Sequence, residues 1–138
     1  MESYRAKLSG PLIDRIDLHV VLPKVDLKEL RGVSKDSRPS ETSDLVRDRV
    51  EACRQIQLDR SGKLNSALTV TELENVTKLS STLNDFLCNA CDRLNLSARA
   101  YHRILKLSRT LADMDESVVV ARHHLAEAIG FRVLDRRN

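Results

Sequence analysis

Three basic side chains lie close together in a segment of the chain whose pattern predicts a helix. Arg99, Arg103 and Lys106 are three or four residues apart, which places them on one helical face. Ser97 precedes them at the position of an N-cap, where its hydroxyl would satisfy a backbone N–H. An arginine in a first helical turn is unusual, because the positive end of the helix dipole favours acidic side chains. Two interpretations stay open: an anion such as phosphate binds at Arg99, or the basic face is simply solvated, which this segment alone favours.

Cysteine and histidine residues show weaker patterns. Cys88-x-x-Cys91 has the spacing of a metal-binding or redox pair, but no second cysteine pair accompanies it. Cys91 also belongs to the apolar stripe of a predicted helix, so we interpret it as a packing residue. The other members of this stripe are Leu83, Phe86, Leu87, Ala90 and Leu94. His123 and His124 have no cysteine or acidic partner at ligand spacing and are predicted to lie on a helix surface.

The composition indicates one α-helical domain. The 138 residues have the length of a single domain, and only 3% are aromatic, with no tryptophan. Leucine, alanine and charged helix formers dominate. The formal net charge of +3 neither demands nor excludes a nucleic-acid partner. An odd number of cysteines, no signal peptide and no apolar run near 18 residues predict a cytoplasmic protein without a membrane segment.

Apolar periodicity predicts the helices that position these residues. They cover about residues 43–60, 81–94, 97–113 and 121–129, with a short helical turn near 72–77. The buried face of the first helix is predicted to consist of Leu45, Val46, Val50, Cys53 and Ile56, with Gly62 just past its end. That of the helix over 97–113 is predicted to consist of Tyr101, Ile104, Leu105, Ser108, Leu111 and Ala112. The last helix is predicted to bury Leu125, Ala128 and Ile129.

The first part of the chain has a different character. Residues 16–22 alternate, end in a β-branched run and are closed by Pro23, which predicts a strand. A lone strand needs a sheet, and no second strand pattern follows. We therefore expect the segment before about residue 40 to be poorly fixed to the helical domain, either disordered or paired with another copy of the chain. Residues 24–42 read as a linker.

Several signatures of nucleotide chemistry are missing from the sequence. It contains no G-x-x-x-x-G-K-[ST] loop and no strand ending in Asp-Glu for magnesium, so these residues alone cannot cradle a nucleoside triphosphate. No Ser/His/Asp or Cys/His arrangement has a recognisable catalytic spacing. The residues by themselves indicate a helical bundle with a basic helix start and an isolated strand.

Two motifs together carry a resemblance to a known family. Residues 9–20 (SGPLIDRIDLHV) and residues 96–105 (LSARAYHRIL) resemble the C-terminal part of the ComM family. These are magnesium-chelatase-like AAA+ ATPases linked to competence and DNA processing. The resemblance covers nearly the whole chain, and its departures are conservative: Ile13 and Ile16 stand where leucine and phenylalanine are also common.

The resemblance implies a domain organisation and two site residues. Residues 1–23 would end an α/β ATPase core and hold its last strand, residues 24–42 would be a linker, and residues 43–138 would form a helical lid. Arg15 would be the arginine finger, reaching the γ-phosphate bound by a neighbouring subunit. Arg99 would be the sensor-2 residue, contacting phosphates within its own subunit or across the ring. The resemblance thus favours phosphate contact at Arg99.

The resemblance also implies cofactors and partners for the full-length protein. It would bind ATP and Mg²⁺, assemble as a hexameric homo-oligomer, and couple hydrolysis to branch migration or helicase action on DNA in natural transformation and recombination. This piece alone is expected to be inactive. Two alternatives stay open: a stand-alone helical module that binds nucleic acid or another partner, suggested by the basic face and tail, and a magnesium-chelatase-type ATPase subunit.

Overall fold

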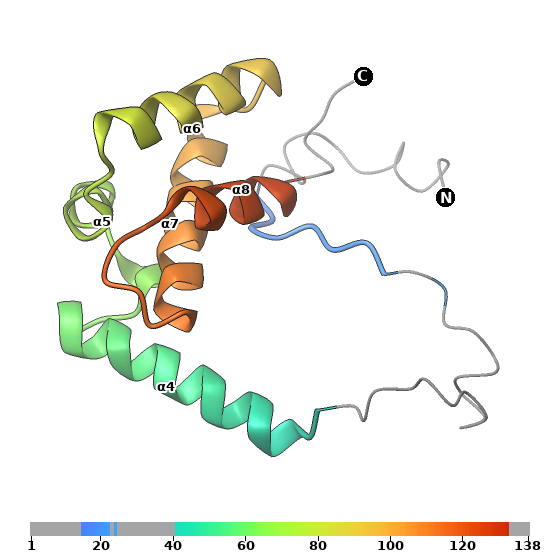
Figure 1. Cartoon of the computed structure of the whole chain (residues 1–138), viewed down its shortest axis with the longest axis vertical. Helices are drawn as coiled ribbons and strands as arrows, with labels where there is room; N and C mark the ends of the chain where they lie inside the picture. Colours follow the sequence, from blue (N-terminus) through green and yellow to red (C-terminus); the bar gives the residue numbers. More distant parts are fainter. Residues whose placement is uncertain (1–14, 23, 25–40, 133–138) are drawn as a thin grey trace.

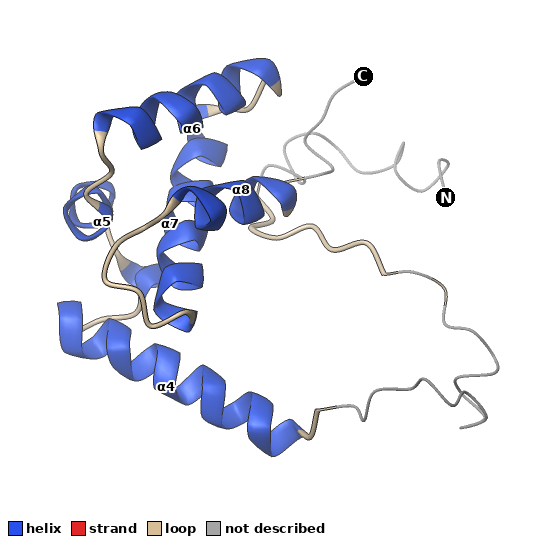
Figure 2. Cartoon of the chain, viewed as in Figure 1, coloured by secondary structure: helices blue, strands red, loops and turns tan. Residues whose placement is uncertain are grey.

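The computed structural model describes residues 15–22, 24 and 41–132. The helices are α4 (Ser43–Ser61), the short 3-10 helix η1 (Asn65–Ala67), α5 (Val70–Thr77), α6 (Ser81–Arg93), α7 (Ala98–Met114) and α8 (Arg122–Gly130). No strand occurs in the described part of the chain, as Figure 2 shows. The predicted fold class, mainly α with a helical lid-type domain, is confirmed. Of the helices described, none combines the length and apolar character needed to cross a membrane.

Helix α7 lies at the centre of the domain. It contacts α4, η1, α5, α6 and α8, which surround it in Figure 1. Its predicted N-cap is confirmed, since Ser97 Oγ accepts the N–H of Ala100 at 3.1 Å. Ile104, Leu105 and Ala112 are buried as predicted. They join a core that also contains Leu68, Leu73, Leu87, Cys91, Val120, Leu125 and Ala128.

Helix α4 packs on the domain through its second half only. Its ends follow local signals: Thr42 Oγ1 caps the start, and Gly62 ends the helix in the left-handed conformation, φ 68°. The prediction that Leu45, Val46 and Val50 lie on a buried face is wrong, because all three are exposed. The N-terminal half of α4 extends past the helices that its C-terminal half contacts, as Figure 1 shows. The buried residues of α4 are Cys53 and Gln57.

Helix α6 begins at Ser81 as predicted, α8 begins one residue later than predicted, and α5 begins two residues before the predicted turn. Thr69 and Glu72 form a capping box at the start of α5, and Ser80 caps α6. The predicted stripe of α6 faces the core: Leu87 and Cys91 are buried, and Leu83 and Phe86 pack against them. Short helices with strong caps are stabilised mainly by such packing.

Residues 15–22 form a loop that begins beside α8 and then leads away from the helices (Figure 2). A strand is defined by hydrogen bonds to a neighbour, and the described residues supply no neighbouring strand. The assignment of this segment to the last strand of an ATPase core, and the domain boundaries at residues 23 and 42, stay predictions. Much of the proposed arm and linker lies outside the described residues.

Candidate functional site

The two predicted site arginines belong to segments that meet at the start of α7. Arg15 and Arg99 are both exposed. Arg103, one helical turn after Arg99, donates from Nη1 to the backbone carbonyl of Arg15 at 2.8 Å. Residues four apart on a helix share a face, so Arg99 lies on the face of α7 that Arg15 approaches. The structure therefore brings the two segments together across a separation of 88 residues between Arg15 and Arg103.

Residues 15–19 are held to α7 and the end of α8 by several further contacts. The Arg103 guanidinium also pairs with the carboxylate of Asp17. Arg132, which is buried, donates to the carbonyl oxygens of Ile16 and Asp17. The backbone N–H of His19 donates to the carbonyl of Phe131 at 2.8 Å, and the His19 side chain is buried. The expectation that this segment is poorly fixed to the helical domain is wrong for residues 15–19.

A shallow cleft of about 410 Å³ lies beside this contact. It is lined by His19, Val20, Val21, Glu127, Gly130 and Phe131. Apolar atoms make most of its walls, and its one acidic side chain would repel a phosphate. The cleft itself is therefore poorly suited to phosphate.

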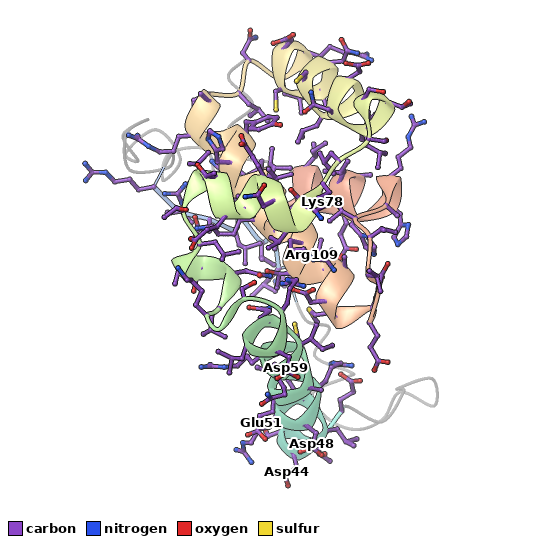
Figure 3. The ribbon with its side chains drawn as sticks, turned by 90° about the vertical axis from the view of Figure 1, so that its left-hand side faces the viewer. Asp44, Asp48, Glu51, Asp59, Lys78 and Arg109 are labelled. Atoms are coloured by element: carbon purple, nitrogen blue, oxygen red, sulfur yellow. The ribbon has the colours of Figure 1, made fainter. Side chains whose placement is uncertain are left out.

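A buried ionic group joins α4, η1 and α7, and sequence reasoning did not identify it. Asp113 accepts hydrogen bonds from Arg109 Nε at 3.0 Å, Arg60 Nη2 at 2.9 Å and Asn65 Nδ2 at 2.8 Å. Arg109 also donates to the carbonyls of Ser117 and Val118. Figure 3 shows Arg109 on α7 near the C-terminal end of α4. We name Arg60, Asn65, Arg109 and Asp113 the Asp113 cluster.

The carboxylate of Asp113 offsets the charge of the buried Arg109, and the second guanidinium, that of Arg60, is partly exposed to solvent. Burial by itself favours the neutral acid, but hydrogen bonds from Arg60 and Asn65 and the charge of Arg109 hold the pKa of Asp113 below its usual value. Burial lowers the pKa of the Arg109 guanidinium. The cluster fixes α4 and the loop after α7 and has a structural function. The signal in the sequence was the Arg109–Asp113 pair at i, i+4 among apolar residues of α7.

The cysteine geometry agrees with a packing role. Cys91 is buried, and burial raises the pKa of its thiol to about 11, so it is a thiol at neutral pH. Cys88 is exposed, and neither residue forms a disulfide. A metal ligand needs the thiolate, which this environment of Cys91 disfavours.

The two histidines differ, and the prediction for one of them is wrong. His123 is exposed, but His124 is buried beneath the start of α8, and an acidic partner, Asp115, lies 3.1 Å from its Nε2. Asp115, His123 and His124 bring their ligand atoms within 4.8 Å of one another. However, His124 Nδ1 accepts the backbone N–H of Ala121 at 2.9 Å, so the neutral ring carries its proton on Nε2. That nitrogen donates to Asp115, and the group caps a helix instead of holding a metal.

Comparison with known families matches both parts of the chain. A family model described as "Magnesium chelatase, subunit ChlI C-terminal" matches residues 40–132. A second, described as "Magnesium chelatase, subunit ChlI", matches residues 1–30. The helices α4 to α8 thus define a C-terminal helical domain of the magnesium chelatase type.

Individual relatives narrow the assignment. The chain is 42% identical over 133 residues to "Competence protein ComM" of Haemophilus influenzae, and 41% identical to the uncharacterized protein YifB of Escherichia coli. The uncharacterized protein Mb2921c of Mycobacterium bovis is 31% identical. The first two matches cover 96% of this chain and 26% of each relative, so the chain spans about a quarter of their length. The chain belongs to the ComM family of magnesium-chelatase-like proteins, which confirms the resemblance found in the motifs.

Proposed function

We propose that this chain is the part of a ring-forming AAA+ ATPase that supplies two phosphate-contacting arginines, Arg15 as arginine finger and Arg99 as sensor 2. The observation that supports this best is the hydrogen bond from Arg103 to the backbone of Arg15, which joins the finger segment to the helical turn after Arg99. Two exposed guanidiniums at one end of α7 are suited to a polyphosphate, because guanidinium is planar, permanently charged and able to form paired hydrogen bonds.

The helix itself adds to the positive field at Arg99. Helix α7 has 17 residues, and its own first turn contributes no acidic side chain, so the helix dipole directs positive potential toward Arg99. An anion close to Arg99 would interact with both the dipole and the guanidinium. This removes the difficulty that an arginine in a first helical turn otherwise presents.

The arginines of this chain could offset the negative charge of ATP phosphates, but the chain does not supply the loop that would bind the nucleotide. Magnesium prefers several oxygen ligands, and the carboxylate near Arg15, that of Asp17, is already paired with Arg103. ATP, when bound, supplies the phosphoryl group whose charge develops during transfer. Arg15 would offset that charge, and Arg99 would link the lid to the phosphates. The nucleotide loop and the magnesium ligands would come from elsewhere in the full-length assembly.

We further propose that hydrolysis in the hexameric full-length protein is coupled to DNA processing. The name of the Haemophilus relative refers to competence. A strong alternative outcome is measurable: tight DNA binding by residues 40–138 alone, with a steep dependence on salt, would instead support a stand-alone nucleic-acid module. A metal-insertion activity would support a chelatase-type subunit.

The Arg15→Ala variant of the full-length protein tests the finger. Turnover should fall by roughly 10³–10⁵, as for other arginine fingers, while nucleotide affinity stays nearly unchanged. Arg47→Ala is the matched control, since Arg47 is an exposed arginine on α4 that pairs with Asp44. Arg99→Ala should weaken nucleotide binding, turnover or both. Steady-state phosphate release and binding of a labelled nucleotide give the two readouts.

Mixed rings decide whether Arg15 acts on a neighbouring subunit. Arg15→Ala subunits and subunits lacking the phosphate loop are each expected to be inactive alone. In a mixed ring, some interfaces join an intact phosphate loop to an intact Arg15, so part of the activity should return. No recovery, despite demonstrated co-assembly, would show that Arg15 acts within its own subunit or is only structural.

A further inference from the structure

The segment that carries Arg15 is fastened to the helical domain by two arginines that act on its backbone. Arg103 of α7 reaches the carbonyl of Arg15, and Arg132, just after α8, reaches the carbonyls of Ile16 and Asp17. Three consecutive carbonyl groups are therefore held by two guanidiniums from different elements. The His19 amide adds a fourth contact to Phe131.

These contacts differ in how firmly they hold the segment. The Asp17 side chain is 74% exposed, so its ion pair with Arg103 contributes little by itself. Arg132 is 1% exposed, and a buried guanidinium forms strong charge-assisted hydrogen bonds to carbonyl oxygens. The rigid fork of arginine also fixes direction, which a lysine does not. The backbone contacts, more than the surface ion pair, determine the position of residues 15–17.

We propose that Arg103 and Arg132 are positioning residues that make the backbone of Arg15 move together with α7 and α8. Arg99 and Arg103 are one turn apart on α7, so Arg103 ties the backbone of Arg15 to the helical turn proposed to contact phosphate through Arg99. Any movement of α7 or α8 would therefore carry the finger segment with it. This inference rests on the proposed roles of Arg15 and Arg99, and its two parts are tested separately.

The first test measures amide hydrogen exchange in the 138-residue chain. Arg103→Met and Arg132→Met retain an unbranched side chain but remove the guanidinium N–H groups that donate to residues 15–17. Each should increase exchange at the His19 amide at least tenfold, while amides of Leu87 and Ile104 in the core keep their protection. Arg54→Met, at an exposed position of α4, is the control. Arg132→Lys is the second variant if Arg132→Met does not fold. Unchanged protection at His19 in the Arg103 and Arg132 variants would overturn the inference.

The second test measures ATP turnover in the full-length protein. Arg103→Met should lower kcat at least tenfold without changing KM for ATP, and Arg103→Lys should restore part of the loss. The double variant Arg15→Ala, Arg103→Met should be no slower than Arg15→Ala alone, because Arg103 acts only through Arg15. A double variant that is slower than Arg15→Ala, or normal turnover of Arg103→Met while Arg15→Ala is inactive, would overturn the positioning role of Arg103 but leave the proposed function intact. Normal turnover of Arg15→Ala would overturn the proposed function itself.

Discussion

At the scale of single residues, the Asp113 cluster is a buried charged group whose stability depends on all of its hydrogen-bond partners. One carboxylate is surrounded by the guanidinium groups of Arg60 and Arg109 and the amide of Asn65. Asp113 and Arg109 are each 1% exposed, so neither charge is stabilised by water. A buried ion pair is stable only while every member keeps its partners, and removal of one member leaves an uncompensated charge.

Asp113→Asn should lower the free energy of unfolding by about 3–5 kcal/mol, because Arg109 would remain buried without a carboxylate. Urea unfolding at neutral pH, followed by circular dichroism, measures the change. Asp85→Asn, at an exposed position of α6, is the control and should change stability by less than about 0.5 kcal/mol. Equal effects of the two substitutions would show that the cluster contributes nothing specific.

The carboxylate of Asp113 should also make the free energy of unfolding decrease as the pH falls. The pKa of Asp113 is lower in the folded chain than its ordinary value near 3.9, so the unfolded state binds more protons in acid. Its contribution is present above about pH 4 and is lost as the pH falls through the folded-state pKa. Unfolding curves between neutral pH and pH 3 should show a smaller loss of stability in Asp113→Asn than in the unsubstituted chain.

At the scale of elements, helix ends could be predicted from the sequence and helix burial only in part. Thr42, Gly62 and Ser97 act within one turn of their own positions, so the sequence pattern contains the whole signal. The exposure of Val46 and Val50 depends on where α4 extends past its neighbours, which no local pattern contains. The same limitation explains why the burial of Arg109 and His124 was missed, since their partners come from other turns, loops or helices.

A pair of glycines tests the end of α4. Gly62 has φ 68° and open space around its missing Cβ, so Gly62→Ala should cost about 1 kcal/mol through backbone strain alone. Gly130 lies within α8, also with open space, and Gly130→Ala should stabilise the chain by up to about 1 kcal/mol. Thermal unfolding midpoints of the two variants should therefore move in opposite directions. A rise in both midpoints would contradict the strain at Gly62.

At the scale of the whole molecule, the fold joins the two ends of the described chain. Residues 15–19 lie against α7 and the end of α8, although the sequence predicted only a weakly attached arm. The motif containing Arg15 and the motif containing Arg99 were both recognised from the sequence. Their contact was not predicted, because Arg103 was interpreted only as part of a basic face and Arg132 lies in neither motif.

The 138-residue chain by itself should not hydrolyse ATP. It presents arginines suited to phosphate but contains no phosphate loop in its sequence, and an arginine finger accelerates only a reaction assembled by other groups. A phosphate-release assay on the purified chain should give no turnover above that of a buffer control. Turnover that Arg99→Ala abolishes would contradict this prediction and the division of labour proposed for Arg15 and Arg99.

Helix α4 has a mechanical consequence that follows from its attachment. Its C-terminal half is clamped to α7 by Arg60 and Cys53, whereas its first ten residues, about 15 Å of helix, overhang the domain. A rigid rod held at one end is a lever arm, and a tilt of a few degrees at the clamp becomes a displacement of ångströms at the tip. Asp44, Asp48 and Glu51 lie along that half of α4 (Figure 3), and Arg47 and Arg49 lie among them, so a tilt at the attached end would displace a row of mixed charges.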